Sequence, residues 1–221
     1  FASSCLVPES VQNPKIYYEN NVSVGLALLH EIIDHKIPKI IFSSSCAVYG
    51  EPEEMPITEH MIKNPSHPYG ETKLAFERIL KWYGKAYGFT AVSLRYFNAA
   101  GATTNLGEHH TPETHLIPNV INAALGRIPH LEVYGTDYDT EDGTCIRDYI
   151  HILDIAEAHI LALNFESSES FNLGNASGYS VKQVIDSAEK ICGTKIPTIE
   201  RPRRAGDPPC LIANARKIQE E

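Results

Sequence analysis

The sequence predicts an α/β fold with a doubly wound parallel sheet and a smaller C-terminal domain. Two observations predict it. A short apolar segment at 39–42 is typical of a strand buried in a parallel sheet, and 90–96 is expected to be the next strand. They alternate with amphipathic helical patterns, one at 17–34 and one that follows Tyr69. This helix, strand, helix, strand order is characteristic of doubly wound sheets.

The first half of the chain gives the clearest pattern. Residues 1–9 are typical of the end of a strand and the loop after it. Apolar residues at helical spacing then predict a helix at 17–34, and the strand at 39–42 runs into three serines that end at Ser45. Ligands bind beyond the carboxyl ends of such strands, which is where Ser45 lies.

The second half is less regular. A loop rich in Pro and Glu leads to the helix of Tyr69, which Gly88 is expected to end. The further elements expected after Asn98 are a helix at 116–125, a strand at 131–134, a helix at 154–165, a strand at 171–173 and a helix at 181–191 that Ser180 caps and Gly193 ends. We therefore expect one domain at 1–97 and a second at 98–221.

Composition excludes several classes of function. The chain has 221 residues, of which 43% are hydrophobic, and a net charge of −9, which argues against general binding to nucleic acid or an anionic membrane. No apolar run approaches the roughly 20 residues of a membrane span, and no secretory signal is visible, so a cytoplasmic protein is expected. The five scattered cysteines favour reduced thiols over a disulfide or zinc framework.

Tyr69 and Lys73 are the first candidate catalytic residues, because residues four apart share one face of a helix. A phenol has a pKa of about 10 and is a poor base, but a nearby ammonium can lower that pKa. The spacing alone is weak evidence in a chain with 11 tyrosines. A solvated lysine beside a packing tyrosine would give the same spacing.

The context of the pair is more specific. A Ser-Ser-Ser run at 43–45 follows a strand, Val-Tyr-Gly at 48–50 and Pro-Tyr-Gly-Glu-Thr-Lys at 68–73 come next, and Arg-Tyr-Phe-Asn at 95–98 follows a second strand. These motifs resemble the extended short-chain dehydrogenase/reductase superfamily, whose core is Rossmann-like. The stretches at 140–144 and 147–151 are similar to those of the UDP-glucose 4-epimerases, and the resemblance covers 1 to about 215.

The resemblance implies NAD as cofactor, a UDP-sugar as substrate, a homodimer and inversion at C4 of the sugar through a transient 4-keto sugar. Ser45, Tyr69 and Lys73 would be catalytic: Ser45 bonds the sugar 4-oxygen, Tyr69 transfers its proton and Lys73 holds the nicotinamide ribose. The residues at NAD-contacting positions of the family are these three with Phe1, Ala2, Ser3, Ser4, Cys5, Asn20 and Phe97. In this family the segment 147–174 returns to the NAD-binding side.

For the nucleotide sugar, the resemblance implies that Arg147 and Arg204 contact the diphosphate and Asp207 a ribose, roles that suit a guanidinium fork and a carboxylate. The arginines at 201–204 could instead form a solvated basic patch. The other positions that match substrate contacts of the family are Ser45, Tyr69, Asn98, His115, Leu116, Glu132, Val133, Tyr134 and Tyr149. Leu211 borders the pocket for the C2 substituent in this family, where a residue smaller than Tyr predicts that N-acetylated sugars are also accepted.

Further functions stay open on sequence alone. A dehydratase of the superfamily would carry an Asp-Glu pair where this chain has Cys46 and Ala47, which disfavours that function. The residues do not exclude a related epimerase, a decarboxylase or an inactive binding module. The sequence contains no Gly-x-x-Gly-x-x-Gly fingerprint, so we expect the phosphate-binding part of the cofactor site to precede Phe1, and the 221 residues alone not to bind NAD.

A metal site is not expected. The stretch from Glu108 to His115 is rich in imidazole and carboxylate, which are metal ligands, but its spacing matches no helical His-x-x-x-His pair. The redox chemistry that the resemblance implies needs no metal.

Overall fold

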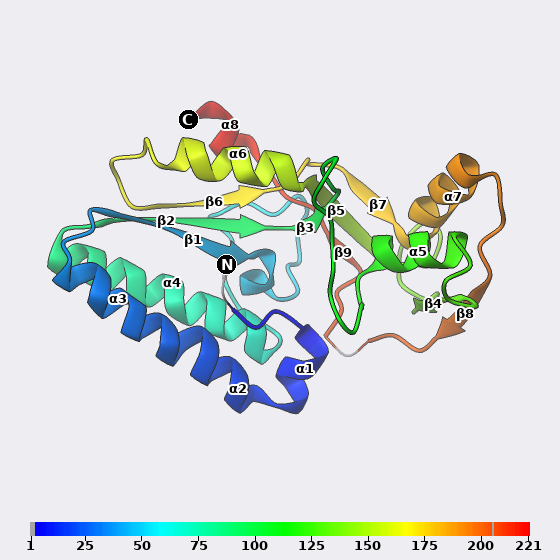
Figure 1. Cartoon of the computed structure of the whole chain (residues 1–221), viewed down its shortest axis with the longest axis horizontal. Helices are drawn as coiled ribbons and strands as arrows, with labels where there is room; N and C mark the ends of the chain where they lie inside the picture. Colours follow the sequence, from blue (N-terminus) through cyan, green and yellow to red (C-terminus); the bar gives the residue numbers. More distant parts are fainter. Residues whose placement is uncertain (1–2, 205) are drawn as a thin grey trace.

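The computed structural model describes residues 3–204 and 206–221, and Figure 1 shows a layered α/β region beside a smaller second region. In the first region, a parallel sheet in the order β1-β2-β6 lies between helices on both faces (Figure 1). Its elements are β1 (Lys39–Ser45), β2 (Thr90–Tyr96), β6 (Glu169–Leu173), α3 (Val24–Asp34), α4 (Pro68–Tyr87), α6 (Ile152–Ala162) and α8 (Arg216–Glu220). The predicted doubly wound α/β fold is confirmed.

The two faces of this sheet explain the apolar strands. Alternate residues of β2 point to opposite faces, so Ala91 packs with the helix residues Phe76 and Leu80, while Val92 and Leu94 pack in a separate cluster with residues of α6. A strand covered on both faces has no solvent-facing side. This is why β2 buries residues on both faces, including the polar Ser93 and Arg95, instead of alternating between buried and exposed positions.

The N-terminal segment differs from the expectation. A loop was expected up to Glu9, but a helix α1 (Val7–Gln12) forms, with Pro8 in its first turn, and α2 (Pro14–Tyr18) begins directly on a proline. The helix predicted at 17–34 is interrupted by a π-helical turn, Glu19–Ser23, before α3 starts. Asn20 and Asn21 lie in this turn, and asparagine is a weak helix former.

Helix α4 follows its sequence signals closely. His67 is the N-cap, and its Nδ1 accepts a hydrogen bond from the Gly70 amide at 3.2 Å. Pro68 occupies the first turn, where its missing N–H costs nothing. Gly88 ends the helix with a φ of 77°, a left-handed conformation that glycine adopts readily.

The second region carries two smaller sheets and two helices. Strand β5 pairs with β3, β7 and β9, and β4 pairs with β8 in parallel. Its elements are β3 (Asn98–Ala100), α5 (Leu116–Ala124), β4 (Leu131–Tyr134), β5 (Ile146–His151), β7 (Gly178–Ser180), α7 (Val181–Cys192), β8 (Thr198–Arg201) and β9 (Cys210–Leu211). The expected Ser180 cap and Gly193 stop of α7 are confirmed, the cap as a full capping box with Gln183.

Each region has its own core. In the second region, Val120 of α5, Val133 of β4 and Ile185 of α7 belong to one buried cluster. Between the regions, Leu211 of β9 shares a cluster with Cys46, just after β1, and with Phe97. The carboxyl end of β1 is therefore packed against the second region. Within the described part of the chain, no helix is long and apolar enough to cross a membrane.

Candidate active site

Ser45 lies at the carboxyl end of β1, and its side chain is at the junction of the two regions. The residue is 9% exposed and has extended backbone angles. Its hydroxyl accepts a hydrogen bond from the Ala47 amide at 3.2 Å and so caps the 3₁₀ turn Cys46–Tyr49. Ser43 and Ser44 also lie within β1, but their hydroxyls bond the side chains of Tyr96 and Glu77, so of the three serines only Ser45 caps the turn.

Tyr69 is held by aromatic contacts on two sides. Its ring stacks on the imidazole of His67, with 6.0 Å between centroids, and meets the edge of the buried Tyr17 ring at 6.5 Å. Burial raises the pKa of Tyr69 above its ordinary value, and a hydrogen bond with Ser45 lowers it. Ser45 and Tyr69, which lie far apart in the sequence, are thus direct neighbours.

Lys73 lies one helical turn beyond Tyr69 and is 4% exposed. Its Nζ donates to Ser3 Oγ and to the Ser43 carbonyl, both at 2.9 Å, and lies 5.8 Å from the centroid of the Tyr69 ring. Burial lowers the pKa of Lys73 to about 8, and the Coulombic effect of Cys5 raises it. Lys73 is consequently only partly charged just above neutral pH.

These values correct one expectation. We expected the Lys73 ammonium to depress the pKa of Tyr69, but that pKa lies above its usual range in this chain. The cause is that both groups leave water together: burial disfavours the phenolate, and it also removes part of the positive charge that would stabilise it.

Ser4, in the segment before α1, is hydrogen bonded to the π-helical turn. Asn21 accepts from the Ser4 amide at 2.8 Å and donates to the Ser4 carbonyl at 3.0 Å, and Asn20 donates to Ser4 Oγ at 3.1 Å. Asn21 also donates to Thr72 in α4 at 3.1 Å, so one side chain joins this segment to the catalytic helix. Sequence reasoning missed Asn21, although a π-helical turn is frequent at functional sites.

The remaining residues at expected NAD positions are placed differently. Phe97 is buried behind the end of β2, whereas Cys5 is exposed and its thiol pKa is raised by partial burial, with Lys73 lowering it. Phe1 and Ala2 lie outside the described residues.

Arg147 and Asp207 form an ion pair within the second region, with 3.4 Å between Nη2 and Oδ1. Arg147 is on β5, where it is the parallel strand partner of Leu211. Further along β5, Tyr149 pairs with Asn98 of β3, and burial raises the pKa of Tyr149 to about 12. These residues, which are distant in sequence, therefore meet on β3, β5, β9 and the loop before β9.

A second group lies on β4 and β8. Glu132 accepts hydrogen bonds from the Tyr134 hydroxyl and from Arg201, and the Arg204 guanidinium lies 4.1 Å from the Tyr134 ring centroid. Val133, between them, points the other way into the core at 5% exposure. Only the backbone of Val133 is therefore available to a ligand. Side chains alternate along a strand, and a position matched to a family contact does not show which way its side chain points.

The loop before α5 brings imidazole and carboxylate groups together. Glu108, His110, Glu113 and His115 each place one ligand atom within 4.8 Å of the others, and His115 Nδ1 lies 2.8 Å from Glu113 Oε1. Leu116 follows as the first residue of α5 and packs against the core of the second region. The spacing argument missed this grouping because a loop, rather than a helix face, assembles it.

Comparisons with known proteins identify the family of this chain. The family model for the NAD-dependent epimerase/dehydratase family matches residues 1–174. The chain belongs to this family. A UDP-glucose 4-epimerase of Halalkalibacterium halodurans is 51% identical over 225 residues, which cover 99% of this chain and 67% of that protein.

Solved structures of epimerases superimpose on the whole chain. A UDP-glucose 4-epimerase from Bifidobacterium longum, in complex with NAD⁺ and UDP, has a TM-score of 0.96 at 43% identity and covers 100% of this chain and 68% of its own. One from Brucella ovis, in complex with NAD, has a TM-score of 0.95 at 49% identity, with 100% and 70% covered. The family is NAD-dependent, and the fold of this chain is that of its solved members.

The residues around Lys73 fit the ribose end of NAD. An ammonium has three hydrogen-bond donors, and Lys73 uses two of them within the described chain, on Ser3 and Ser43. A ribose hydroxyl can take the third. The sequence holds no Gly-rich turn for the pyrophosphate, so these residues suit the nicotinamide ribose and not the phosphates.

Proposed function

We propose that this chain supplies the catalytic and sugar-binding part of a UDP-glucose 4-epimerase, an isomerase that interconverts UDP-galactose and UDP-glucose. The observation that carries the proposal is the meeting of Ser45, Tyr69 and Lys73 from a strand end and a helix face. NAD, when bound, accepts the hydride from C4 of the sugar and returns it.

Tyr69 is assigned proton transfer. In its ionised form, the Tyr69 phenolate takes the proton of the sugar 4-hydroxyl as the C4–H bond breaks and becomes a neutral phenol; it gives this proton back when the C4–H bond re-forms on the other face. Ser45, which is hydrogen bonded to Tyr69, orients the same 4-oxygen. Lys73 holds the ribose of the cofactor with its third donor. Because protons and hydride are returned, the substrate is inverted at C4 with no net oxidation.

The second region is assigned the nucleotide. Arg147 and Arg204 bind the diphosphate, because a guanidinium offers paired donors to phosphate oxygens. Asp207, now paired with Arg147, turns to the ribose hydroxyls. Glu132, Tyr134, Tyr149 and the Val133 backbone, with Leu116 at the start of α5, line the uridine side. Asn98, the strand partner of Tyr149, and His115, the residue before Leu116, are also assigned to the nucleotide sugar.

Dehydration is disfavoured by the residues beside Ser45. A dehydratase needs a general acid and base there, but burial raises the pKa of the Cys46 thiol to about 11, and Ala47 has no ionisable group. The same position in this chain therefore serves packing: Cys46 belongs to the cluster of Leu211 and Phe97.

We extend the proposal to a cytoplasmic homodimer. Helices α3 and α4 share a buried cluster on the sheet side, yet they expose large apolar residues on the outer side. The exposed apolar residues of these helices are Val24, Leu28, Trp82 and Tyr87. An apolar outer face on two adjacent helices suits an interface with a second copy.

The test is an assay of the full-length protein with UDP-galactose and NAD. We expect UDP-glucose to form and the reverse reaction to reach the same equilibrium mixture. If a 4-keto-6-deoxy sugar forms and UDP-glucose does not, the protein is a dehydratase. If carbon dioxide forms from a UDP-uronic acid and UDP-glucose does not, the protein is a decarboxylase.

A further inference from the structure

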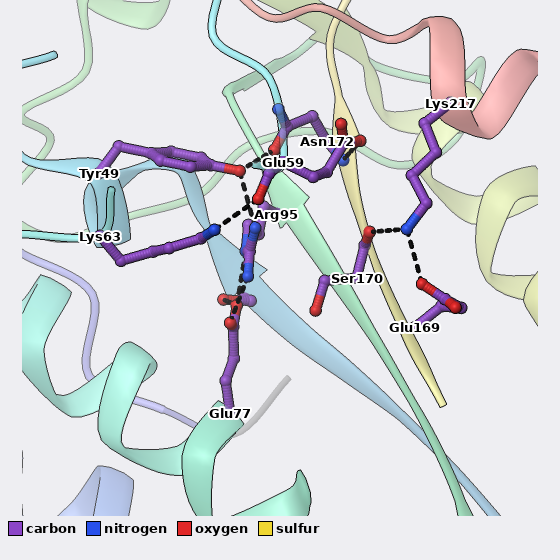
Figure 2. Close-up of polar contacts among 10 residues, drawn as sticks. Tyr49, Glu59, Lys63, Glu77, Arg95, Glu169, Ser170, Asn172 and Lys217 are labelled. Carbon is purple, nitrogen blue, oxygen red and sulfur yellow. Dashed lines mark hydrogen bonds and ion pairs between the residues drawn. The ribbon is translucent and has the colours of Figure 1, made fainter. Parts of the chain in front are cut away.

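A buried polar network lies behind the candidate active site, on the α4 side of the sheet (Figure 2). At its centre, the Glu77 carboxylate accepts from Ser44 Oγ at 2.5 Å and from Arg95 Nε and Nη2 at 2.9 and 2.6 Å. We call Ser44, Glu77 and Arg95 the Glu77 clamp. The side chains of Arg95 and Glu77 are 6% and 8% exposed, so the ion pair is almost fully removed from water.

Each part of the clamp is next to a residue of the proposed mechanism. Ser44 precedes Ser45 in β1. On β2, Arg95 is the strand partner of Ser44. Glu77 lies one helical turn after Lys73 and two after Tyr69, on the same face of α4. Given the proposed function, we propose that the Glu77 clamp is a positioning device that sets Ser45 of β1 against Tyr69 of α4.

Stability alone does not account for the clamp. Replacing a buried ion pair by well-packed apolar residues is often neutral or stabilising, because taking two charges out of water is costly. An apolar pair would also pack α4 on the sheet, as Phe76 and Leu80 do with Ala91. A carboxylate that accepts three hydrogen bonds adds a fixed distance and angle between the helix and the strand.

Arg95 extends this fixation to the turn after Ser45. Its Nη1 donates to the Tyr49 hydroxyl at 2.7 Å, and that hydroxyl donates to Asn172 Oδ1 of β6 at 2.7 Å. Tyr49 ends the 3₁₀ turn that Ser45 caps. Ser45 is therefore held from both sides, through Ser44 before it and through the Tyr49 turn after it.

Asn172 links the network to the loop at 51–66. The Asn172 amide donates to Glu59 Oε1 at 2.8 Å, and Figure 2 shows these two residues side by side. The Asn172 side chain donates to the Ile57 carbonyl, also at 2.8 Å. This loop leads into His67, the cap of α4 and the stacking partner of Tyr69. One network thus fixes the strand, the helix and the segment that joins them.

A neighbouring ion pair provides a matched control. Lys217 of α8 donates to Glu169 Oε2 at 2.6 Å and to the Ser170 carbonyl at 3.1 Å, as Figure 2 also shows. It joins α8 to the start of β6. This pair is more exposed than the clamp, at 27% and 37%, and Asn172 is the residue of β6 that belongs to the network around Ser45.

The clamp should be visible in the ionisation of Tyr69. The hydrogen bond with Ser45 lowers the pKa of Tyr69 against the effect of burial, so displacement of Ser45 raises it. The other titratable groups that act on or contact Tyr69 are Cys5, Tyr17, Cys46, His67, Lys73 and Tyr96. None of them is part of the clamp or changes in its variants.

The experiment compares Glu77→Gln, Ser44→Ala and Glu169→Gln in the full-length NAD-loaded enzyme. For Glu77→Gln we expect kcat for UDP-galactose to fall about 10- to 100-fold, since a displacement of about 1 Å can cost this much, and KM to stay within about threefold. The rise of kcat with pH should move to higher pH, because more base is needed to ionise Tyr69. Ser44→Ala should change kcat and the pH profile in the same direction but by less. Glu169→Gln should change neither kcat nor the pH profile.

Several outcomes would overturn the proposal. If Glu77→Gln and Ser44→Ala lower the melting temperature but keep the kcat and the pH profile of the wild type, the clamp is structural only. If Glu169→Gln lowers kcat as much as Glu77→Gln, the effect is not positional. Should Glu77→Gln fail to fold, Ser44→Ala decides, because it removes only one hydroxyl. A wild-type enzyme without epimerase activity would instead refute the proposed function.

Discussion

Around Ser45 and Tyr69 the charged partners are buried, whereas around β4 and β8 they lie on the surface. The Arg95–Glu77 pair is 6% and 8% exposed, but Arg201–Glu132 is 44% and 37% exposed and Arg203–Asp137 is 45% and 74% exposed. Exposed pairs contribute little and are screened by salt, while a buried network holds its geometry. The comparison suggests that one region fixes the chemistry and the other adapts to the nucleotide.

Tyr69→Phe should give the largest effect and tests the rigid region. It removes the phenolic hydroxyl that transfers the proton and keeps the ring, so we expect kcat to fall 10²- to 10⁴-fold, while the affinity for UDP-sugar stays near that of the wild type. Ser45→Ala should cost less, because it removes a hydrogen bond and not the base. Measurement of kcat and of UDP-sugar affinity by calorimetry checks both. A Phe variant that keeps more than about a tenth of the turnover would exclude Tyr69 as the base.

Leu211→Tyr tests the junction of the two regions. Leu211 is buried in one cluster with Cys46, the neighbour of Ser45, and is the strand partner of Arg147, so it is close to residues of both proposed sites. We expect the wild type also to interconvert UDP-GlcNAc and UDP-GalNAc. The variant should lose about 10- to 100-fold in kcat/KM for these sugars and little for UDP-galactose, because an acetamido group meets the larger ring.

Leu211→Phe is the control for this prediction. It adds the ring without the hydroxyl, so a steric gate predicts the same loss for Phe as for Tyr. If the ratio of kcat/KM for the two substrate pairs is unchanged in both variants, Leu211 does not form the gate. If both substrates suffer equally, overpacking of the core is the cause.

Some elements of the fold could be predicted from the sequence and others could not. The strands at 90–96 and 131–134 and the end of α4 at Gly88 agree with the structure, because local apolar pattern and a glycine stop determine them. Strand β5 was missed, since its buried Asp148 breaks the apolar pattern; that carboxylate accepts from the amides of Asn175, Ala176 and Ala213. Partners so far apart in sequence leave no local signal.

The candidate site divides in a similar way. Ser45, Tyr69 and Lys73 could be named from motifs, and the structure brings them together. The inward direction of Val133 and the raised pKa of Tyr69 could not be foreseen, because both depend on what buries each group. The domain division at 97 and 98 stays a prediction, as do the ligand roles.

Arg147→Lys tests the nucleotide side of the comparison at a buried arginine of β5. Lysine keeps the charge but loses the guanidinium fork, so we expect KM for UDP-galactose to rise about tenfold with kcat within about twofold. Arg203→Lys is the matched control, because Arg203 is exposed, pairs with Asp137 and belongs to no proposed contact. Steady-state kinetics of both variants checks this. Equal effects of the two substitutions would mean that general charge, rather than a specific contact, binds the diphosphate.

The pH dependence of stability gives the smallest effect and tests whether Lys73 is buried as the geometry indicates. Its folded pKa of about 8 lies below the usual lysine value of about 10.4, so between these values the unfolded chain binds more protons than the folded one. Stability contributed by Lys73 is therefore absent below pH 8 and grows as pH rises, by about 1 kcal/mol between pH 7.5 and 9. Lys73→Met should remove this increment, while Lys81→Met, on the exposed face of the same helix, should retain it. Urea unfolding of the wild type and the two variants at pH 7.5 and 9 decides the question. If the free energy of unfolding of all three proteins rises equally with pH, Lys73 is charged in the folded state. The contrast between a buried catalytic region and a screened binding region then loses its central residue.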